Sequence, residues 1–322
     1  MSACRSGPRR HTCTDRPRTT LAPAGPVRAT HPSYVWSRPL SARRIDLHTH
    51  STASDGTTEP GELVLQARLA GLDVVALTDH DTTSGWAPAA ASRPEGLALV
   101  RGAEISCSRG GISLHLLAYL FDAEEPDLAA RLAALVDSRV HRAERMVALL
   151  TADGAGVTWE RVRQLAGGTV GRPHVAQALI EQGHVSTVSE AFTPEWIGTH
   201  GRYWVGKLEL DVVEAVGLVV RAGGAAVFAH PAARRRGRTV TDDVITEMAA
   251  AGLAGLEVDH VDHDAQARAD LRALAADLDL VTTGSSDYHG TNKTVQLAAN
   301  LTPESSYEAI VERATGVPVL GP

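Results

Sequence analysis

The sequence predicts an α/β domain built around a mostly parallel sheet, and three observations support this. Short apolar runs alternate with stretches of helical length and period through most of the chain, as in folds whose parallel strands are joined by helices. His, Asp and Glu recur where the apolar runs end, and α/β folds place their sites at the carboxyl ends of strands. The chain has 322 residues, 43% of them hydrophobic. One large domain with an insertion, or two domains, fits that length.

Residues 1–43 differ in composition from the rest. They are rich in Arg, Pro, Ser and Thr and follow neither a helical nor a strand period, so we expect a disordered extension. A wrongly assigned start site and an organelle-type targeting peptide are alternatives. Nine of the 31 basic and one of the 38 acidic residues lie in 1–44, which leaves 22 basic and 37 acidic residues. Such an acidic domain argues against a general nucleic-acid-binding surface and suits carboxylates neutralised by cations.

Cysteine content and hydropathy bear on the compartment. Cys4, Cys13 and Cys107 form no Cys-x-x-Cys pair, so we expect no disulfide framework and a reducing, cytoplasmic location. No apolar run reaches the roughly 18 residues of a membrane helix, and the start of the chain lacks the apolar stretch of a secretory signal. We expect neither a membrane segment nor a stable protein partner.

The alternation of strands and helices begins after the extension. Residues 59–70 are predicted as a helix, with Pro60 in its first turn and Gly71 at its end. The predicted strands here are residues 44–49, 72–78, 97–105 and 112–120. The candidate ligands that they carry or precede are His48, His50, His80, Glu104 and His115.

Residues 123–203 are predicted as a helical insertion that caps the sheet, with helices at 128–150, 159–165 and 173–182 and no convincing strand. The alternation then resumes, with helices at 211–222, 240–251 and 265–276 and strands at 225–229, 255–259 and 280–284. The strand at 225–229 leads to His230, and the strand at 280–284 leads to Asp287 and His289. The strand at 255–259 carries Glu257 and Asp259 and is followed by His260. Residues 44–122 and 204–322 are thus expected to form one domain.

Two pairs of ligand-type residues stand at spacing i, i+2: His48 with His50, and Asp287 with His289. Side chains at this spacing point to the same side of a strand, so we expect each pair to converge. Together with the residues at other strand ends, the pairs predict a multinuclear metal site for hydrolysis. Imidazole and carboxylate ligands suit Mn²⁺, Zn²⁺ or Fe²⁺, and the lack of thiolates argues against a Cys-based structural zinc site.

The motifs resemble those of the polymerase and histidinol phosphatase (PHP) superfamily of phosphoesterases, from about residue 44 to the C-terminus. The shared phrases are His48-Thr-His-Ser-Thr-Ala-Ser-Asp-Gly-Thr, Ala76-Leu-Thr-Asp-His-Asp-Thr and Gly171-Arg-Pro-His. With the helical insertion, they are most similar to the branch of 3′,5′-nucleotide bisphosphate phosphatases and 5′→3′ exoribonucleases. The resemblance implies a distorted (β/α)₇ barrel with a trinuclear site.

The resemblance also implies the ligands of three divalent ions, with Mn²⁺ favoured. The first ion would take His48, His50, Glu104 and Asp287; the second Glu104, His115 and His230; the third Asp55, His80 and His289. Asp55, His80, Glu104 and Asp287 are accordingly expected to be catalytic. Every position holds the expected residue type.

Arg172 and His174 lie in the insertion, and the resemblance implies that they face the metals and bind substrate phosphate. Arg suits this because its planar fork pairs with two phosphate oxygens. A plain helix start is the alternative, and His174 as general acid is a further one. The basic run at residues 234–238 follows His230 and is either an RNA-backbone contact or a solvated loop.

Asp79 and Asp81 flank His80. Each either orients a ligand imidazole or caps a turn. Glu257, Asp259 and His260 are expected to line the pocket without binding a fourth metal.

We therefore expect metal-dependent hydrolysis of a nucleotide-type phosphate ester. The reaction would be removal of the 3′-phosphate from nucleoside 3′,5′-bisphosphates, 5′→3′ trimming of short RNA, or both. A small-molecule phosphomonoesterase of the histidinol-phosphatase type would use the same metal residues. A non-catalytic module that binds metal or nucleic acid is the third hypothesis.

Overall fold

The computed structural model describes residues 42–321, so the predictions for the extension before them lie outside the described part. The strands are β1 (Ile45–Asp46), β2 (Val74–Leu77), β3 (Ala98–Arg109), β4 (Ile112–Tyr119), β5 (Leu210–Asp211), β6 (Ala225–Phe228), β7 (Gly255–Asp259) and β8 (Val281–Gly284). The helices are α1 (Pro60–Leu69), α2 (Trp86–Ser92), α3 (Pro126–Ala152), α4 (Trp159–Ala166), α5 (Arg172–Glu181), α6 (Val188–Ala191), α7 (Val212–Arg221), α8 (Asp242–Ala250), α9 (Ala265–Asp277) and α10 (Glu304–Arg313).

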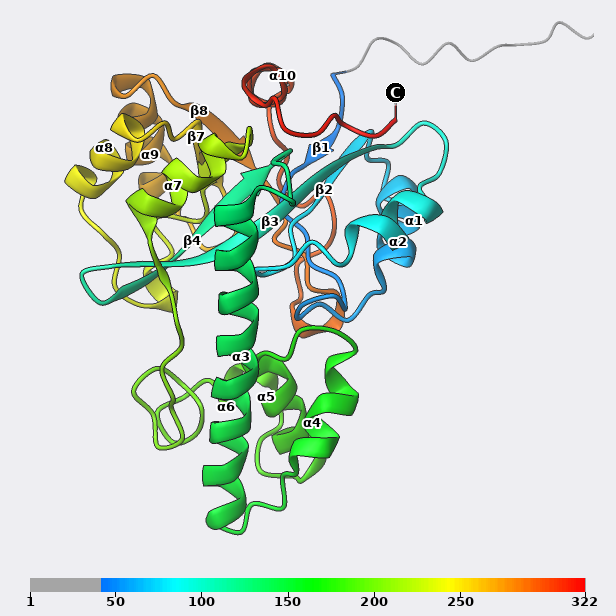
Figure 1. The fold of residues 1–322 in the computed structure, drawn as a ribbon, viewed down its shortest axis with the longest axis vertical. Coiled ribbons are helices and arrows are strands. Elements are labelled where there is room, and N and C mark those ends of the chain that lie inside the picture. The colour runs from blue at the N-terminus through cyan, green and yellow to red at the C-terminus, as the bar shows by residue number, and fades with distance from the viewer. Residues whose placement is uncertain (1–41, 322) are drawn as a thin grey trace, which may run out of the picture. The chain divides into compact units, whose positions relative to one another are not determined.

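Seven strands follow one another in the order β1-β2-β3-β4-β6-β7-β8, and β5 pairs with β3 (Figure 1). Only β4 runs against its neighbours; the other pairings are parallel. A parallel bridge between Thr49 and Tyr288 links the chain beyond β1 to the chain beyond β8. The sheet is thus nearly closed, which confirms the predicted α/β class and distorted barrel.

Strand alternation fills the barrel interior with apolar side chains and points one candidate ligand, His115, inward. On β4, Leu117 and Tyr119 belong to an apolar cluster that also contains Val227 of β6, whereas the intervening Leu116 and Ala118 belong to another cluster together with α7 and α8. The first cluster is therefore the barrel interior. His115 shares the inner face of β4 with Leu117. Because β4 is reversed, its first residues lie at the rim where the parallel strands end.

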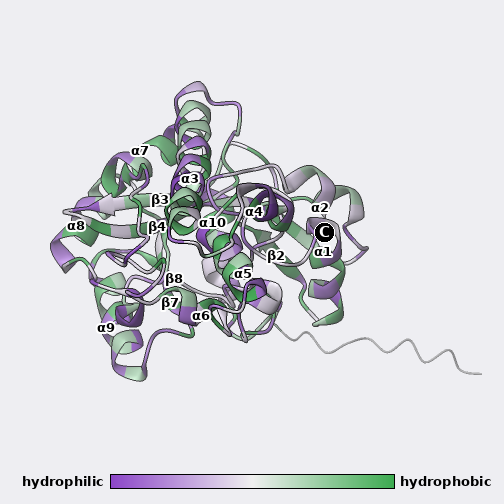
Figure 2. Ribbon diagram, turned by 90° about the horizontal axis from the view of Figure 1, so that it is seen from below, coloured by the Kyte–Doolittle hydropathy of each residue, from purple (hydrophilic) through white to green (hydrophobic). Residues whose placement is uncertain are grey.

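Helices surround the barrel and cover its outer face. In Figure 2 they carry alternating hydrophilic and hydrophobic bands, as expected of helices with one buried face. None of the helices within residues 42–321 combines the length and the apolar composition that a membrane crossing requires.

The segment between β4 and β5 contains helices and no strand. Its C-terminal part has its own core, formed by residues between Ala143 and Val205, while Leu128, Leu132 and Leu135 of α3 pack on the barrel. Helix α3 thus runs from the barrel into the insertion, where α4, α5 and α6 lie beside its lower half (Figure 1). The bounds 123–203 remain a prediction, because α3 contributes to both cores.

Candidate metal centre

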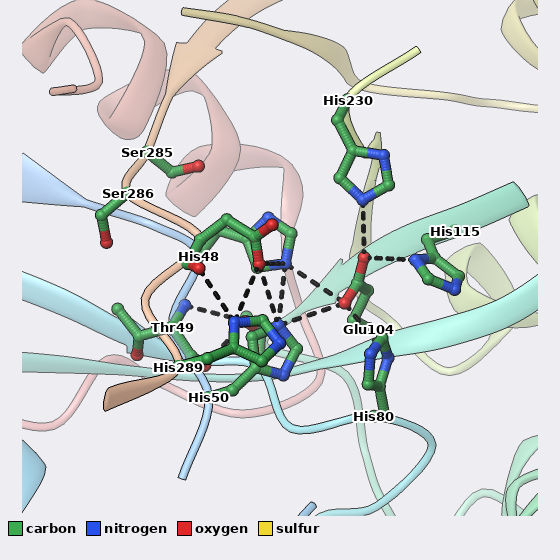
Figure 3. A network of polar contacts seen from close by, with 12 residues as sticks. His48, Thr49, His50, His80, Glu104, His115, His230, Ser285, Ser286 and His289 are labelled. Atoms are coloured by element: carbon green, nitrogen blue, oxygen red, sulfur yellow. Dashed lines mark hydrogen bonds and ion pairs between the residues drawn. The ribbon is translucent and has the colours of Figure 1, made fainter. Parts of the chain in front are cut away.

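The predicted ligands converge at one rim of the barrel, around the carboxylate of Glu104 (Figure 3). Glu104 lies on the inner face of β3, and His80, just beyond β2, forms a bridge with it. His115 comes from β4, and His230 follows β6. The remaining residues lie in loops after β1 and β8: His48, His50, Asp55, Asp287 and His289.

The first group has the four residues that the resemblance implied. His48 Nε2 and His50 Nε2 are 3.0 Å apart, and both face Glu104 Oε2, at 3.2 and 3.1 Å. Asp287 Oδ1 lies 3.4 and 3.5 Å from the same two nitrogens. Ligand atoms bound to one metal at tetrahedral angles would be about 3.4 Å apart, so the donor set fits a cation.

The second group is formed by His115 and His230, which face Oε1 of Glu104. His115 Nδ1 lies 2.8 Å and His230 Nε2 3.1 Å from Glu104 Oε1. His80 Nδ1 lies 3.1 Å from Oε2. The Nδ1 atoms of His80 and His115 are buried and have no hydrogen-bond partner within residues 42–321. Buried nitrogens that face a carboxylate without donating to it are oriented as co-ligands of a cation would be.

The third group is centred on Asp55. His289 Nε2 is 3.3 Å from Asp55 Oδ1, and His80 Nε2 is 3.6 Å from Oδ2. His50 Nδ1 also faces Asp55 Oδ1, at 3.7 Å, and can join these three around one cation. His50 and His80 therefore each lie between two groups, and the division of nine ligands among three ions remains a prediction.

Backbone conformation, rather than strand alternation, brings the last pair together. Strand β1 ends at Asp46 and β8 at Gly284, before either pair of predicted ligands. Asp287 has a φ of 52°, in the left-handed region that non-glycine residues seldom adopt. His289 Nδ1 lies 3.4 Å from Asp287 Oδ1. The pairs converge, as expected, but they flank the single bridge between Thr49 and Tyr288 rather than lying within β1 and β8.

Glu104 and two of the imidazoles around it, those of His80 and His230, hold the protonation states that bind metal. Burial raises the pKa of Glu104, but His115, His80 and His48 outweigh burial and hold it well below its usual range. Burial lowers the pKa of His230 to about 3 and that of His80 well below its usual value. An ionised carboxylate and neutral imidazoles are the forms that bind a cation.

Glu257 is buried beneath the first group. It accepts hydrogen bonds from His48 Nδ1 at 3.0 Å, from the backbone N–H of His230 at 2.7 Å and from Ser285 Oγ. His260 Nε2 lies 3.3 Å from Asp287 Oδ2. Both residues were expected to line the pocket. Asp259 was too, but it pairs with Arg268 and Arg272 on the side of α9.

Neither aspartate beside His80 contacts an imidazole. Asp79 accepts from the backbone N–H and hydroxyl of Ser51 and from the hydroxyl of Ser54, so it fixes the turn that carries Asp55. Asp81 accepts from the backbone N–H and hydroxyl of Ser106 and from Arg139 Nε. Asp79 thus holds a turn of another segment, after β1, rather than the turn that follows it, and Asp81 joins β3 to α3.

Two cations hold the outer oxygen of Asp287, and the sequence alone did not reveal this. Arg236 Nη2 donates to Asp287 Oδ2 at 2.8 Å and Lys293 Nζ donates to it at 2.6 Å. Arg236 belongs to the basic run and, like Arg234 and Arg235, is exposed. A run of like charges gave no signal that one member reaches Asp287.

The insertion rests on the loop that carries Asp55. The backbone N–H of Thr169 donates to Ala53 O at 3.0 Å, and a Cβ at Gly168 would lie 2.5 Å from Thr52 O. Only glycine fits there. A Cβ added to Gly171, at the start of α5, would lie 3.9 Å from Asp55 Cβ. Helix α5 therefore begins beside the third group.

His174 and Arg172 lie at this end of α5. His174 is buried, and its Nδ1 accepts from the backbone N–H of Gly171 at 2.9 Å, so its proton is assigned to Nε2. Burial lowers the pKa of His174. The guanidinium of Arg172 stacks on Phe192 at 4.7 Å and donates to Ile197 O at 3.5 Å. Its remaining N–H groups have no partner within residues 42–321.

Comparison with known proteins gives consistent results. The family model described as PHP domain matches residues 46–153. The chain is 34% identical over 255 residues to the 3′,5′-nucleoside bisphosphate phosphatase of Chromobacterium violaceum, covering 76% of this chain and 87% of that protein. It is 32% identical over 260 residues to the 5′-3′ exoribonuclease of Haemophilus influenzae, covering 80% and 94%.

A solved structure is also similar. It is that of a Bifidobacterium adolescentis protein assigned as a metal-dependent phosphoesterase, with a TM-score of 0.82 and 36% identity over 85% of this chain and 98% of that one. The similarity therefore extends well beyond the ligand motifs.

Proposed function

The chain belongs to the PHP family and is a metal-dependent phosphoesterase, and from this premise we propose that its substrate is a nucleotide or short RNA. The reaction is removal of the 3′-phosphate from nucleoside 3′,5′-bisphosphates, 5′→3′ trimming of short RNA, or both. The observation that carries the proposal is the convergence of nine ligand-type residues, Glu104 among them, beside an insertion whose Arg172 has N–H groups left to bind an anion.

We propose three divalent ions, with Mn²⁺ favoured and Zn²⁺ or Fe²⁺ as alternatives. Glu104 would bridge two of them, because its oxygens face different histidines. When bound, the ions neutralise the phosphate and lower the pKa of a coordinated water. Asp55, His80, Glu104 and Asp287 would position the ions, and Asp79 would hold the turn that carries Asp55.

Arg172 and His174 would bind the substrate from the insertion. The lowered pKa of His174 leaves its imidazole neutral near pH 7, with the proton on Nε2. A neutral imidazole donates a hydrogen bond readily but is a weak acid. We therefore favour hydrogen bonding to phosphate for His174 over protonation of the leaving oxygen.

Family membership favours an enzyme over a non-catalytic module, but the metal residues do not distinguish a nucleotide from a small-molecule substrate. A cytoplasmic location is part of the proposal and is supported by the absence of paired cysteines in the sequence.

Substrate choice is tested by phosphate release from adenosine 3′,5′-bisphosphate and from histidinol phosphate, with Mn²⁺-loaded and chelator-treated protein. A 5′-phosphorylated short RNA is assayed in parallel for nucleotide release. Metal-dependent preference for either nucleic-acid substrate supports the proposal. Preference for histidinol phosphate would overturn it.

A further inference from the structure

Asn292 connects the backbones of two metal ligands of the third group. It ends the 3₁₀ helix η2 (Gly290–Asn292), which begins directly after His289. Its side-chain Nδ2 donates to Asp55 O at 2.8 Å, and its backbone N–H donates to His289 O at 3.4 Å. The side chains of Asp55 and His289 face each other at 3.3 Å. Asn292 therefore fixes the spacing between the two segments that carry these ligands.

The other end of the Asn292 amide reaches the insertion. Asn292 Oδ1 accepts a hydrogen bond from Gln177 Nε2 of α5 at 3.0 Å. The orientation of both amides follows from Asp55 O, because a carbonyl oxygen can only accept. The N–H₂ of Asn292 must face this oxygen, which leaves Oδ1 for the N–H₂ of Gln177. Two hydrogen bonds in series thus join α5 to the backbone of Asp55.

In the described part of the chain, this link is the one side-chain hydrogen bond from α5 to the barrel. The other polar side chains of α5 bond within the insertion: Arg172 to Ile197 O, His174 to the N–H of Gly171, and Glu181 to Arg161. Gln177 follows His174 by three residues, so the two lie on the same face of the helix. This face of α5 is therefore held at the third group through Asn292.

We propose that Asn292 is a positioning residue that couples cation binding at the third group to the position of α5. The inference rests on the third ion of the proposed function. When a cation holds Asp55 and His289, both segments that Asn292 joins are fixed, and Gln177 is fixed with them. Coupling between two sites is reciprocal, so a fixed α5 strengthens cation binding by the same factor by which the cation stabilises α5.

Calorimetric titration of Mn²⁺ into metal-free protein, without substrate, tests the coupling. Gln177→Met breaks the link at a residue that has no hydrogen bond to a metal ligand, and Asn292→Leu breaks it at the ligands themselves. Loss of one neutral hydrogen bond changes an equilibrium by about 3- to 10-fold. We expect each variant to bind one of three Mn²⁺ equivalents more weakly by at least about that factor. The control is Gln182→Met, exposed directly after the same helix, which should bind Mn²⁺ as the wild type does.

The double variant distinguishes coupling from two separate local effects. Because both residues act through one link, Gln177→Met should cause no further loss of Mn²⁺ affinity when Asn292→Leu is already present. Additive losses would overturn the inference, and so would normal Mn²⁺ binding by Gln177→Met. If the wild type binds fewer than three Mn²⁺ ions, the proposed third ion and this inference fail together. If it binds three and no variant weakens any of them, this inference fails alone.

Amide hydrogen exchange gives a second readout, which a general loss of stability would not produce because it compares each protein with and without Mn²⁺. Adding Mn²⁺ should slow exchange in α5 of the wild type and of Gln182→Met. The slowing should be smaller in Gln177→Met and in Asn292→Leu, whose link to the third group is broken. Equal slowing in all four proteins would show that the cation does not act on α5 through Asn292.

Discussion

His48 Nδ1 donates to Glu257 Oε1 at 3.0 Å, and this bond determines which nitrogen of His48 faces the metal centre. When Nε2 gives up its proton to a cation, the remaining proton stays on Nδ1, and the lone pair of Nε2 points at Glu104 and Asp287. Both residues of the bond are fully buried. The same carboxylate holds the backbone of His230, so Glu257 positions one imidazole from each of two metal groups.

Glu257→Gln should therefore weaken metal binding without removing a ligand. An amide can present its N–H₂ to His48 and reverse the tautomer, and loss of such outer partners typically costs 10- to 100-fold in metal affinity or activity. The Mn²⁺ concentration for half-maximal activity, and Mn²⁺ binding by calorimetry, should both rise about tenfold or more. Unchanged Mn²⁺ affinity would show that Glu257 does not position His48.

Asp287→Asn should abolish turnover while the fold remains intact. Asp287 faces both imidazoles of the first group, and an amide lacks the charge that binds a cation. Activity with Mn²⁺ should fall at least about a thousandfold, on the scale of losses when a catalytic unit is broken. Circular dichroism should match the wild type. Near-normal turnover would contradict a metal at this position.

Arg236→Gln tests whether the cations that bind Asp287 Oδ2 hold this carboxylate in position. Arg236 and Lys293 both donate to Asp287 Oδ2, which leaves Oδ1 for a cation. Loss of the guanidinium should lower kcat on a mononucleotide about tenfold, a typical effect of a lost charge-assisted bond. The exposed neighbour Arg235 provides the control, Arg235→Gln, which should retain activity on the same substrate. If both variants lose activity equally, the whole loop matters rather than this contact.

Arg172→Ala should reduce activity on bisphosphorylated nucleotides and short RNA far more than on a generic aryl phosphate. The aryl compound places its single phosphate at the metals and does not reach the insertion. We expect a loss of about 10- to 100-fold for the nucleotides and a small loss for the aryl phosphate. Equal losses in kcat/KM on both would remove the recognition role.

The sequence predicted the metal ligands better than it predicted the residues and strand directions that position them. His48, Glu104 and His115 were found because imidazoles and carboxylates recur together at several strand ends and in the shared motifs. The reversal of β4 was not predicted, since an apolar run carries no direction, yet it brings His115 to the rim. The burial of Arg142 on α3 was not predicted either, because it lies in the run His141-Arg142-Ala143-Glu144-Arg145, where charged residues suggest a solvated face. Burial of one of them depends on contacts that no local pattern encodes.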